Sequence, residues 1–248
     1  MEIRSFGVGE RISECHRLLS EHFVAERGGE ILLLPIPSTR DNRYITGTSV
    51  EIADLLPLVR AGVGVVGYNI PPLLREKAHS VFATVYDAAL DEDFLIKNAE
   101  LTARGTVGYI LTHYPRDIAD MSVGVVGYGR IGSRLVRWLL LLGADLTVYT
   151  TRESLALELC EAGISAKPIG KEIDLTGLDI LINTAPARQI DVEMLDKQTE
   201  IIDLASGNNF SPSERLTKLS SVPDVYYPKT AGRLYAEGAI RALRGDFV

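Results

Sequence analysis

Three glycines with the spacing G-x-G-x-x-G, Gly127, Gly129 and Gly132, form the motif in this sequence that most directly indicates a bound ligand. A β-branched run, 123–126, precedes them, and a helical pattern, 131–142, follows. In this setting the first glycine permits a tight turn, the second lets the backbone approach a pyrophosphate, and the third lets the helix and strand pack closely. The start of the helix then offers free N–H groups to the phosphates. The pattern predicts a Rossmann-type dinucleotide-binding turn. Its residues are Gly127, Tyr128, Gly129, Arg130, Ile131 and Gly132.

The end of the next predicted strand, 146–149, bears on which dinucleotide would bind. An NAD site usually has Asp or Glu there to hold the ribose 2′-hydroxyl. Here Thr150, Thr151 and Arg152 follow the strand, and no carboxylate comes before Glu153. Hydroxyls and a guanidinium suit a 2′-phosphate, because the guanidinium can bind it bidentately. The sequence therefore favours NADP over NAD. The alternative is that Arg152 is a solvated surface residue and Glu153 holds the ribose of NAD.

Two further apolar runs, 179–183 and 201–204, are predicted strands of the same sheet. In a doubly wound parallel sheet, ligands bind beyond the carboxyl ends of the strands. We therefore expect the loops after these strands to flank the nicotinamide ring, and their small residues leave room for it. The residues expected to contact the cofactor there are Thr184, Ala185, Pro186, Ala205 and Ser206.

The whole chain alternates short apolar runs with helical patterns, which is typical of α/β proteins with parallel strands. We predict two domains. Residues 1–97 form a smaller flavodoxin-like α/β domain that lines the substrate cleft. Residues 98–248 form a Rossmann-type doubly wound parallel sheet, entered through a connecting helix, 98–113. Further strands are predicted at 31–35, 62–68 and 81–86, and helices at 49–60, 71–78, 91–99 and 233–243.

The composition and net charge of the chain indicate which classes of protein it can belong to. The chain has 248 residues, 46% hydrophobic and 24% charged, which is enough to bury a core in each of two domains. Its net charge of −7 argues against nucleic-acid binding through a general basic surface. The two cysteines and four histidines have no metal or redox spacing, so we expect no metal site. The N-terminal residues lack a long apolar core, and the apolar run 138–142 is too short to cross a bilayer, so we expect a cytoplasmic protein without a membrane segment.

Several stretches together resemble the A subunits of dipicolinate synthase, which are spore-specific oxidoreductases related in fold to the D-2-hydroxyacid dehydrogenases. The matching stretches are NAELTARGTVGYIL, VGVVGYGRIGSRL, LGADLTVYTTR, DILINTAPA, IIDLAS and PKTAG, between Asn98 and Gly232, and LLLPIPST earlier in the chain. The resemblance implies dehydrogenation of dihydrodipicolinate, or its hydroxy-tetrahydro precursor, to dipicolinate with NADP as acceptor. It also implies a partner, the flavoprotein-like B subunit, and the mother cell of a sporulating bacterium is the implied location.

The sequence departs from that family in three places. The first strand and helix of the opening domain are weakly represented in residues 1–23. The segment GNNFSPSE, 207–214, stands where the family tends to have a glycine-rich turn, and Val225, Tyr226 and Tyr227 replace a Gly-Leu-Pro-Gly run. All three changes fall where the substrate cleft is expected.

A pyridine dicarboxylate substrate requires cations or anion-binding loops. Ser38, Thr39 and Arg40 are candidates to bind one carboxylate. Candidates for the other are Lys229, Thr230 and Arg233, with Thr230 expected to cap the final helix. Asn98 and Thr102, at the start of the connecting helix, are expected to face the cleft. The sequence identifies no general base.

Two other functions remain open. A D-2-hydroxyacid dehydrogenase would use a histidine acid/base in the second half of the chain, but the histidines are His16, His22, His79 and His113. Their positions argue against that chemistry. Alternatively, the chain binds a dinucleotide without catalysis and serves as a redox sensor or a scaffold. For such a fold, a homodimer is the default expectation.

Overall fold

The computed structural model describes residues 2–23, 29–170, 173–186 and 190–245. The chain divides into two compact units, which are described separately below. The first unit comprises the chain up to Asn98 together with the segment from Pro223 onwards, and the second comprises Ala99–Val222. Each unit contains one parallel β-sheet with helices packed on it, so the predicted α/β fold class is confirmed.

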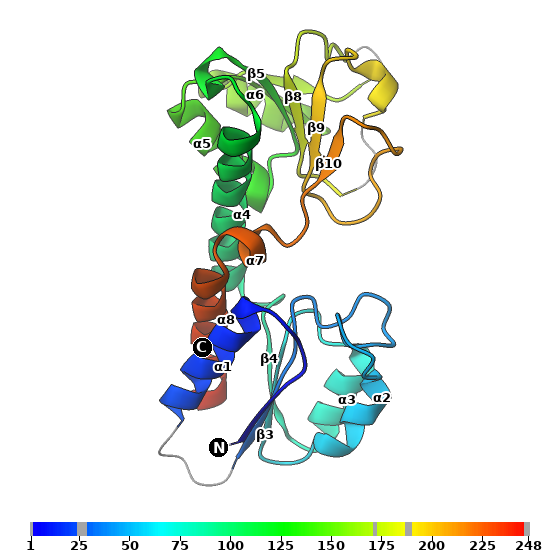
Figure 1. Ribbon diagram of the computed structural model, residues 1–248, viewed down its shortest axis with the longest axis vertical. Helices are drawn as coiled ribbons and strands as arrows, with labels where there is room; N and C mark the ends of the chain where they lie inside the picture. Colours follow the sequence, from blue (N-terminus) through cyan, green and yellow to red (C-terminus); the bar gives the residue numbers. More distant parts are fainter. Residues whose placement is uncertain (1, 24–28, 171–172, 187–189, 246–248) are drawn as a thin grey trace. The chain divides into compact units, whose positions relative to one another are not determined.

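The first unit is built on a four-stranded parallel sheet in the order β1-β2-β3-β4 (Figure 1). One face is covered by helices α1 and α8 and the first part of α4, and the other by α2, η1 and α3. Because both faces are covered, β2 and β3 are buried along their whole length, which explains their continuous apolar sequences. The bounds are β1 Glu2–Ser5, α1 Glu10–His22, β2 Glu30–Leu33, α2 Ile52–Leu55, η1 Leu56–Leu58, β3 Val63–Gly67, α3 Pro72–Ser80, β4 Thr84–Asp87, α4 Glu92–His113 and α8 Pro228–Arg244.

The first strand and helix of this unit are fully formed, so the expectation that residues 1–23 represent them weakly was wrong. Strand β1 pairs in parallel with β2. Helix α1 buries Ile12, Cys15 and Leu19, which recur at helical spacing between polar residues. Burial raises the pKa of the Cys15 thiol, which therefore stays protonated at neutral pH.

The C-terminal helix α8 belongs to the first unit, although the sequence analysis assigned the chain's end to the second domain. Small residues let α8 approach its neighbours closely. A Cβ atom on Gly232 would lie 2.5 Å from the backbone of α1, and one on Gly238 would overlap the hydroxyl of Tyr86. Tyr235 is fully buried and donates its hydroxyl to the carbonyl oxygen of Leu34 at 3.0 Å. Helix α8 therefore completes the core of the first unit.

Two predicted helices differ in extent from the structure. Helix α4 is continuous, whereas the sequence pattern divided it into 91–99 and 98–113. The helix predicted at 49–60 is replaced by the short α2 and η1. Helix α2 begins with a capping box, in which the side chains of Glu51 and Asp54 bind each other's backbone N–H groups.

The second unit contains a six-stranded parallel sheet in the order β10-β9-β8-β5-β6-β7. Read from β7, this is the Rossmann strand order. All strands stay parallel, but β5, β6 and β7 are added toward one edge of the sheet and β8, β9 and β10 toward the other, so the order switches between β5 and β8. Helices α5 and α6 and the later part of α4 cover one face, while η3 and neighbouring irregular segments cover the other. The bounds are η2 Ile118–Asp120, β5 Ser122–Val126, α5 Arg130–Leu141, β6 Asp145–Thr150, α6 Glu153–Glu161, β7 Ala166–Pro168, β8 Ile180–Asn183, η3 Val192–Met194, β9 Glu200–Asp203 and β10 Leu216–Lys218. Helix α7, Val222–Tyr226, follows, and apart from Val222 its residues belong to the first unit.

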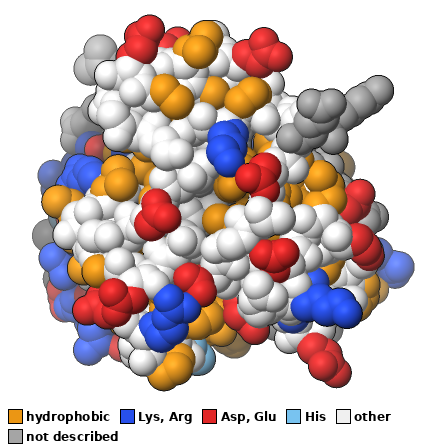
Figure 2. All heavy atoms as spheres, turned by 90° about the horizontal axis from the view of Figure 1, so that it is seen from above, with side chains coloured by type: hydrophobic (Ala, Val, Ile, Leu, Met, Phe, Trp, Pro, Cys, Tyr) orange, Lys and Arg blue, Asp and Glu red, His pale blue; other side chains and the backbone are white. Residues whose placement is uncertain are grey.

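The surface carries charges of both signs. On the face drawn in Figure 2, acidic and basic side chains are interspersed, and the described residues form no continuous basic patch there. No helix within the described ranges is long and apolar enough to cross a membrane.

The close approach of α8 to β4 generates a stability prediction. Gly238→Ala should lower the free energy of unfolding by about 1–3 kcal/mol, because the new methyl group would overlap the Tyr86 hydroxyl. This loss should outweigh the gain of about 1 kcal/mol that alanine brings to a helix. Urea denaturation measures the change. The matched control is Glu237→Ala at the exposed neighbouring position, and equal stability of the two variants would contradict the close packing.

Candidate functional site

The glycine motif forms a tight turn between β5 and α5, at the point where the strand order of the second sheet reverses. Gly127 has a φ of +90°, which L-residues rarely adopt. Its N–H donates to the carbonyl oxygen of Tyr149 in β6 at 2.8 Å. A Cβ atom on Gly132 would overlap the carbonyl oxygen of Gly127, so only glycine lets the helix pack this closely on the turn. Gly129, by contrast, faces open space, since a Cβ atom there would meet no atom within 4 Å.

The open position at Gly129 coincides with the start of α5. Gly129 is the N-cap residue, and no side chain caps the helix. The first-turn N–H groups therefore remain available to an anion, and the helix dipole favours negative charge there. Tyr128 and Ile131 are half-buried, and Arg130 is exposed at the first helical position. This arrangement fits a pyrophosphate approaching the backbone at Gly129.

Thr184, which was predicted to contact the cofactor, lies directly behind the turn. Its hydroxyl donates to the carbonyl oxygen of Val126 at 2.9 Å and lies 3.4 Å from that of Gly127. Cβ atoms on Gly127 and Gly132 would each lie 2.9 Å from the same hydroxyl oxygen. The hydroxyl therefore holds the turn from within the protein. Of the two residues that follow it, Ala185 is half-buried and Pro186 is exposed.

The end of β6 presents an exposed cation. The hydroxyl of Thr150 is buried and accepts the N–H of Arg152 at 3.2 Å, which fixes the backbone here. Thr151, Arg152 and Glu153 are exposed. In the part of the chain that the structure describes, the Arg152 guanidinium has no hydrogen-bond or ion-pair partner. Burial raises the pKa of the neighbouring Tyr149 phenol to about 12, so this group stays neutral at physiological pH.

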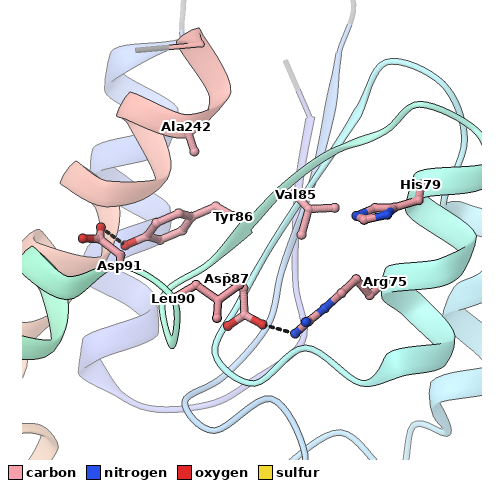
Figure 3. Close-up of a pocket in the computed structure, with 8 residues that line it drawn as sticks. All are labelled: Arg75, His79, Val85, Tyr86, Asp87, Leu90, Asp91 and Ala242. Atoms are coloured by element: carbon pink, nitrogen blue, oxygen red, sulfur yellow. Dashed lines mark hydrogen bonds and ion pairs between the residues drawn. The ribbon is translucent and has the colours of Figure 1, made fainter. Parts of the chain in front are cut away.

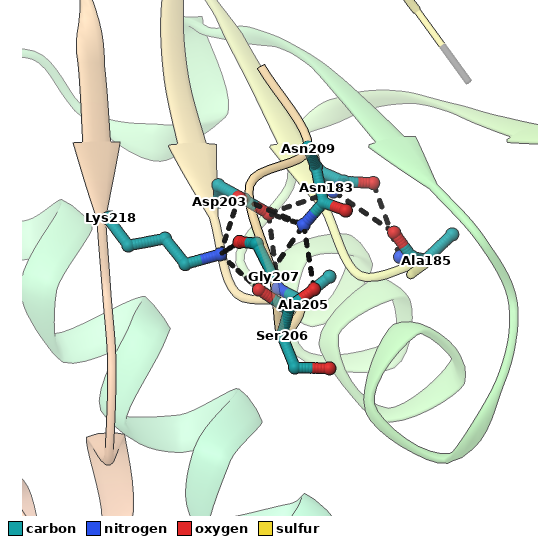
Figure 4. Close-up of polar contacts among 8 residues, drawn as sticks. All are labelled: Asn183, Ala185, Asp203, Ala205, Ser206, Gly207, Asn209 and Lys218. Atoms are coloured by element: carbon teal, nitrogen blue, oxygen red, sulfur yellow. Dashed lines mark hydrogen bonds and ion pairs between the residues drawn. The ribbon is translucent and has the colours of Figure 1, made fainter. Parts of the chain in front are cut away.

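A buried polar network that the sequence analysis missed organises the loop after β9 (Figure 4). Asp203 accepts hydrogen bonds from Asn183 Nδ2 at 2.8 Å, from Asn209 Nδ2 at 3.1 Å and from Lys218 Nζ at 2.6 Å. Asn183, Asp203 and Asn209 are all buried. Lys218 also donates to the carbonyl oxygens of Ala205 and, at 2.9 Å, Gly207.

The network fixes the positions of Ala205 and Ser206, which were predicted to flank the nicotinamide. The N–H of Ala205 donates to Asp203 Oδ1 at 3.1 Å, and the carbonyl oxygen of Ser206 accepts Asn209 Nδ2 at 3.2 Å. One sequence signal was available. Asn183 ends one predicted strand and Asp203 is the last but one residue of the next, and parallel pairing of β8 with β9 sets them opposite each other.

The hydroxyl groups of two substrate candidates after β2, Ser38 and Thr39, accept hydrogen bonds from backbone N–H groups of nearby loops. Ser38 is fully buried, and its hydroxyl accepts the N–H of Tyr68 at 2.9 Å, which ties this loop to the one after β3. The Thr39 hydroxyl accepts the N–H of Asn42 at 3.0 Å. Backbone N–H groups also lower the pKa of the nearby Asp41 carboxyl. Arg40 is exposed.

The remaining substrate candidates lie on α4 and α8. Asn98 accepts a hydrogen bond from Arg11 at 2.9 Å, and Thr102 is buried in the second unit. Lys229 is exposed and lies 3.7 Å from Glu10, and Arg233 is exposed. The expectation that Thr230 caps the final helix was wrong. Helix α8 begins two residues earlier, at Pro228, whose fixed φ suits a first helical position, and its N-cap is Tyr227.

The chain is similar to known proteins both in sequence and in structure. No family model matches the chain. Over 156 residues it is 28% identical to the A subunit of dipicolinate synthase from Bacillus subtilis (strain 168), a match that covers 58% of this chain and 52% of that protein. The structure matches that of the dipicolinate synthase A subunit from Bacillus halodurans with a TM-score of 0.80 and 23% identity, covering 98% and 97% of the two chains. The chain resembles the A subunits of dipicolinate synthase in sequence and in fold.

A more distant structural match supports the wider fold relationship. The NAD complexed form of the D-isomer specific 2-hydroxyacid dehydrogenase from Lactobacillus delbrueckii ssp. bulgaricus matches with a TM-score of 0.55 and 14% identity, over 99% and 97% of the two chains. The predicted relation to the D-2-hydroxyacid dehydrogenase fold is thus confirmed. In the curated sequence match, the chain spans about half the length of the Bacillus subtilis protein.

The polar network generates a second stability prediction. Lys218→Met should lower the free energy of unfolding by about 1–3 kcal/mol, because Asp203 would keep a buried carboxylate without its cation. Amide hydrogen exchange should also accelerate at residues 205–209, because the carbonyl oxygens of Ala205 and Gly207 lose the lysine. Lys197→Met, at an exposed position, is the matched control. Unchanged exchange in Lys218→Met would show that the lysine does not hold this loop.

Proposed function

We propose that this chain is an NADP-dependent oxidoreductase subunit that dehydrogenates dihydrodipicolinate, or its hydroxy-tetrahydro precursor with loss of water, to dipicolinate. The observation that carries the proposal is the unobstructed turn at Gly129, at the switch point of a Rossmann sheet. The particular reaction is proposed because the sequence is similar to the A subunit of dipicolinate synthase. An oxidoreductase role is also supported by the shared dehydrogenase fold.

The residues of the second unit fit a nicotinamide dinucleotide. The backbone at Gly129 and the uncapped start of α5 would bind the pyrophosphate. The loops that begin at Thr184 and Ala205 would flank the nicotinamide, and hydrogen bonds within the protein hold both of these residues. When the dinucleotide is bound, its nicotinamide ring supplies the hydride acceptor. The protein's own task is to orient the two reactants.

Preference for NADP rests on Arg152. Its guanidinium is exposed just beyond the carboxyl end of β6, beside the Thr151 hydroxyl. Neither group forms a hydrogen bond with another described residue, so both are available to a 2′-phosphate. Glu153, one residue further, begins α6.

The substrate's carboxylates need cationic partners. We assign this task to Arg40 in the loop after β2, and to Lys229 and Arg233 on α8, all of which are exposed. Conversion of a dihydropyridine ring to an aromatic one removes a hydride and a proton. Because aromatisation is strongly downhill, holding the two carboxylates is the main contribution proposed for these side chains.

The proposal extends to partners and location. The Bacillus subtilis relative is named as one subunit of its enzyme, which supports a second, B-type subunit that binds this chain. The site would then act in the cytoplasm of the mother cell during spore formation. Because the segments 207–214 and 225–227 depart from the family where the substrate cleft is expected, dinucleotide binding without turnover is the second candidate function.

Arg152→Gln tests the cofactor assignment. Loss of the guanidinium should weaken NADP binding by about tenfold or more, because a bidentate charge-assisted contact disappears, and should leave NAD binding nearly unchanged. Isothermal titration calorimetry measures both affinities. Arg137→Gln, at an exposed position on α5, is the control. Equal losses for NADP and NAD would refute the 2′-phosphate role.

A coupled assay tests the reaction. Pyruvate and aspartate semialdehyde are condensed enzymatically, and this chain is added with NADP, with and without the B subunit of a dipicolinate synthase. We expect dipicolinate absorbance that depends on this chain and is reduced in Arg152→Gln. Tight NADP binding without product in the presence of the B subunit would favour the non-catalytic candidate.

A further inference from the structure

The first unit has a hollow of about 450 Å³ beside its edge strand β4 (Figure 3). Helix α3 contributes Arg75 and His79 to one side. The strand contributes Val85 and Asp87, and the turn after it contributes Leu90. The polar groups around this hollow differ in how much of their hydrogen-bonding capacity the protein already uses.

Both carboxylate oxygens of Asp87, at the end of β4, already accept hydrogen bonds from the protein. Its Oδ1 accepts the N–H groups of Asn69 at 2.8 Å and Ala89 at 3.1 Å. Its Oδ2 accepts the N–H of Ile70 at 3.0 Å and the guanidinium of Arg75 at 2.5 Å. With four donors and a paired charge, this carboxylate has little capacity left for a ligand.

Asp91, the second carboxylate at the hollow, is equally occupied. It accepts the N–H of Phe94 at 3.1 Å, the hydroxyl of Tyr86 at 2.9 Å and the guanidinium of Arg241 at 3.2 Å. Burial and hydrogen bonding keep Tyr86 protonated, since they raise its pKa. Neither acidic group therefore offers the hollow a free acceptor.

The unused hydrogen-bonding capacity around the hollow lies on its two basic residues, Arg75 and His79. Arg75 bonds its partners through Nη2 alone, and its Nε is buried without an acceptor among the described residues. His79 is exposed, and its imidazole has no hydrogen-bond partner within the described ranges. Nη1 of Arg75 forms no hydrogen bond with a described residue, so this group and the imidazole N–H are the donors that an anion in the hollow can use.

The other walls are apolar. Val85 on the strand faces the His79 ring in Figure 3, and Ala242 of α8 also lines the hollow. Leu90 exposes 75% of its surface at the rim. A ligand held here would cover this leucine, which water surrounds otherwise.

We propose that this hollow binds a small organic anion, a carboxylate or phosphate monoester attached to a hydrophobic body. Arg75 and His79 bind the anionic group, and Val85 and Leu90 contact the hydrophobic body. The site is independent of the proposed dinucleotide site, because every residue that lines it belongs to the first unit.

Titration of the full chain with benzoate and with phenyl phosphate, followed by amide chemical shifts, tests the proposal. We expect saturable shifts at Val85–Asp91 and along α3, and the tighter of the two probes identifies the anion. Benzamide, a neutral molecule of the same shape, should bind at least about tenfold more weakly. Equal binding of benzamide, shifts confined to other segments, or no shifts up to about 10 mM of both anions would overturn the proposal.

Two variants assign the donors. His79→Gln and Arg75→Gln should each weaken the better anion by about tenfold. Arg75→Gln also removes the partner of buried Asp87, so its folding is checked first by circular dichroism, and exposed His79 provides a variant free of that complication. Lys77→Gln, on the same helix but outside the hollow, is the control and should bind as the wild type does. Unchanged affinity in His79→Gln and in folded Arg75→Gln would overturn the assignment.

Discussion

The contact between helix α5 and the end of strand β5 is the constraint on which the candidate dinucleotide site depends. Gly132 lies so close to the carbonyl oxygen of Gly127 that any side chain there would force the helix away. The Thr184 hydroxyl occupies the remaining space behind the turn. Since the helix cannot withdraw without breaking this packing, the uncapped N–H groups of its first turn are held at the one place where Gly129 leaves room.

A second constraint acts on the loops beside that turn. Asp203 collects donors from a neighbouring strand, from its own loop and from Lys218, and so gives a segment rich in small residues a defined course. A buried, satisfied polar network specifies one conformation where apolar packing alone would permit several. The starts of the loops after β8 and β9 are thus held in different ways: Thr184 by its own hydroxyl, and Ala205 by a buried carboxylate.

Local features of the chain were predictable where local physics decides them. The need for glycine at 127 and 132 follows from the motif, and the buried strands β5, β8 and β9 follow from their apolar runs. Long-range pairing was not predictable. Lys218 reaches Asp203 only because β10 pairs with β9, and no pattern in the sequence indicates the partner of so short a strand. Ser38, Thr150 and Thr184 have residue types suited to ligand binding, yet their hydroxyls bind backbone groups, a use that sequence alone does not distinguish.

The position of helix α8 has a consequence for how the chain reaches its native state. The first unit is discontinuous in sequence, and Tyr235 and Ala239 fill the core that β2, β3 and α1 begin. During synthesis these early segments leave the ribosome about two hundred residues before the side chains that complete their core. The second unit, by contrast, is one uninterrupted stretch, Ala99–Val222. The second unit can therefore fold first, while the unit that begins the chain waits for its last helix.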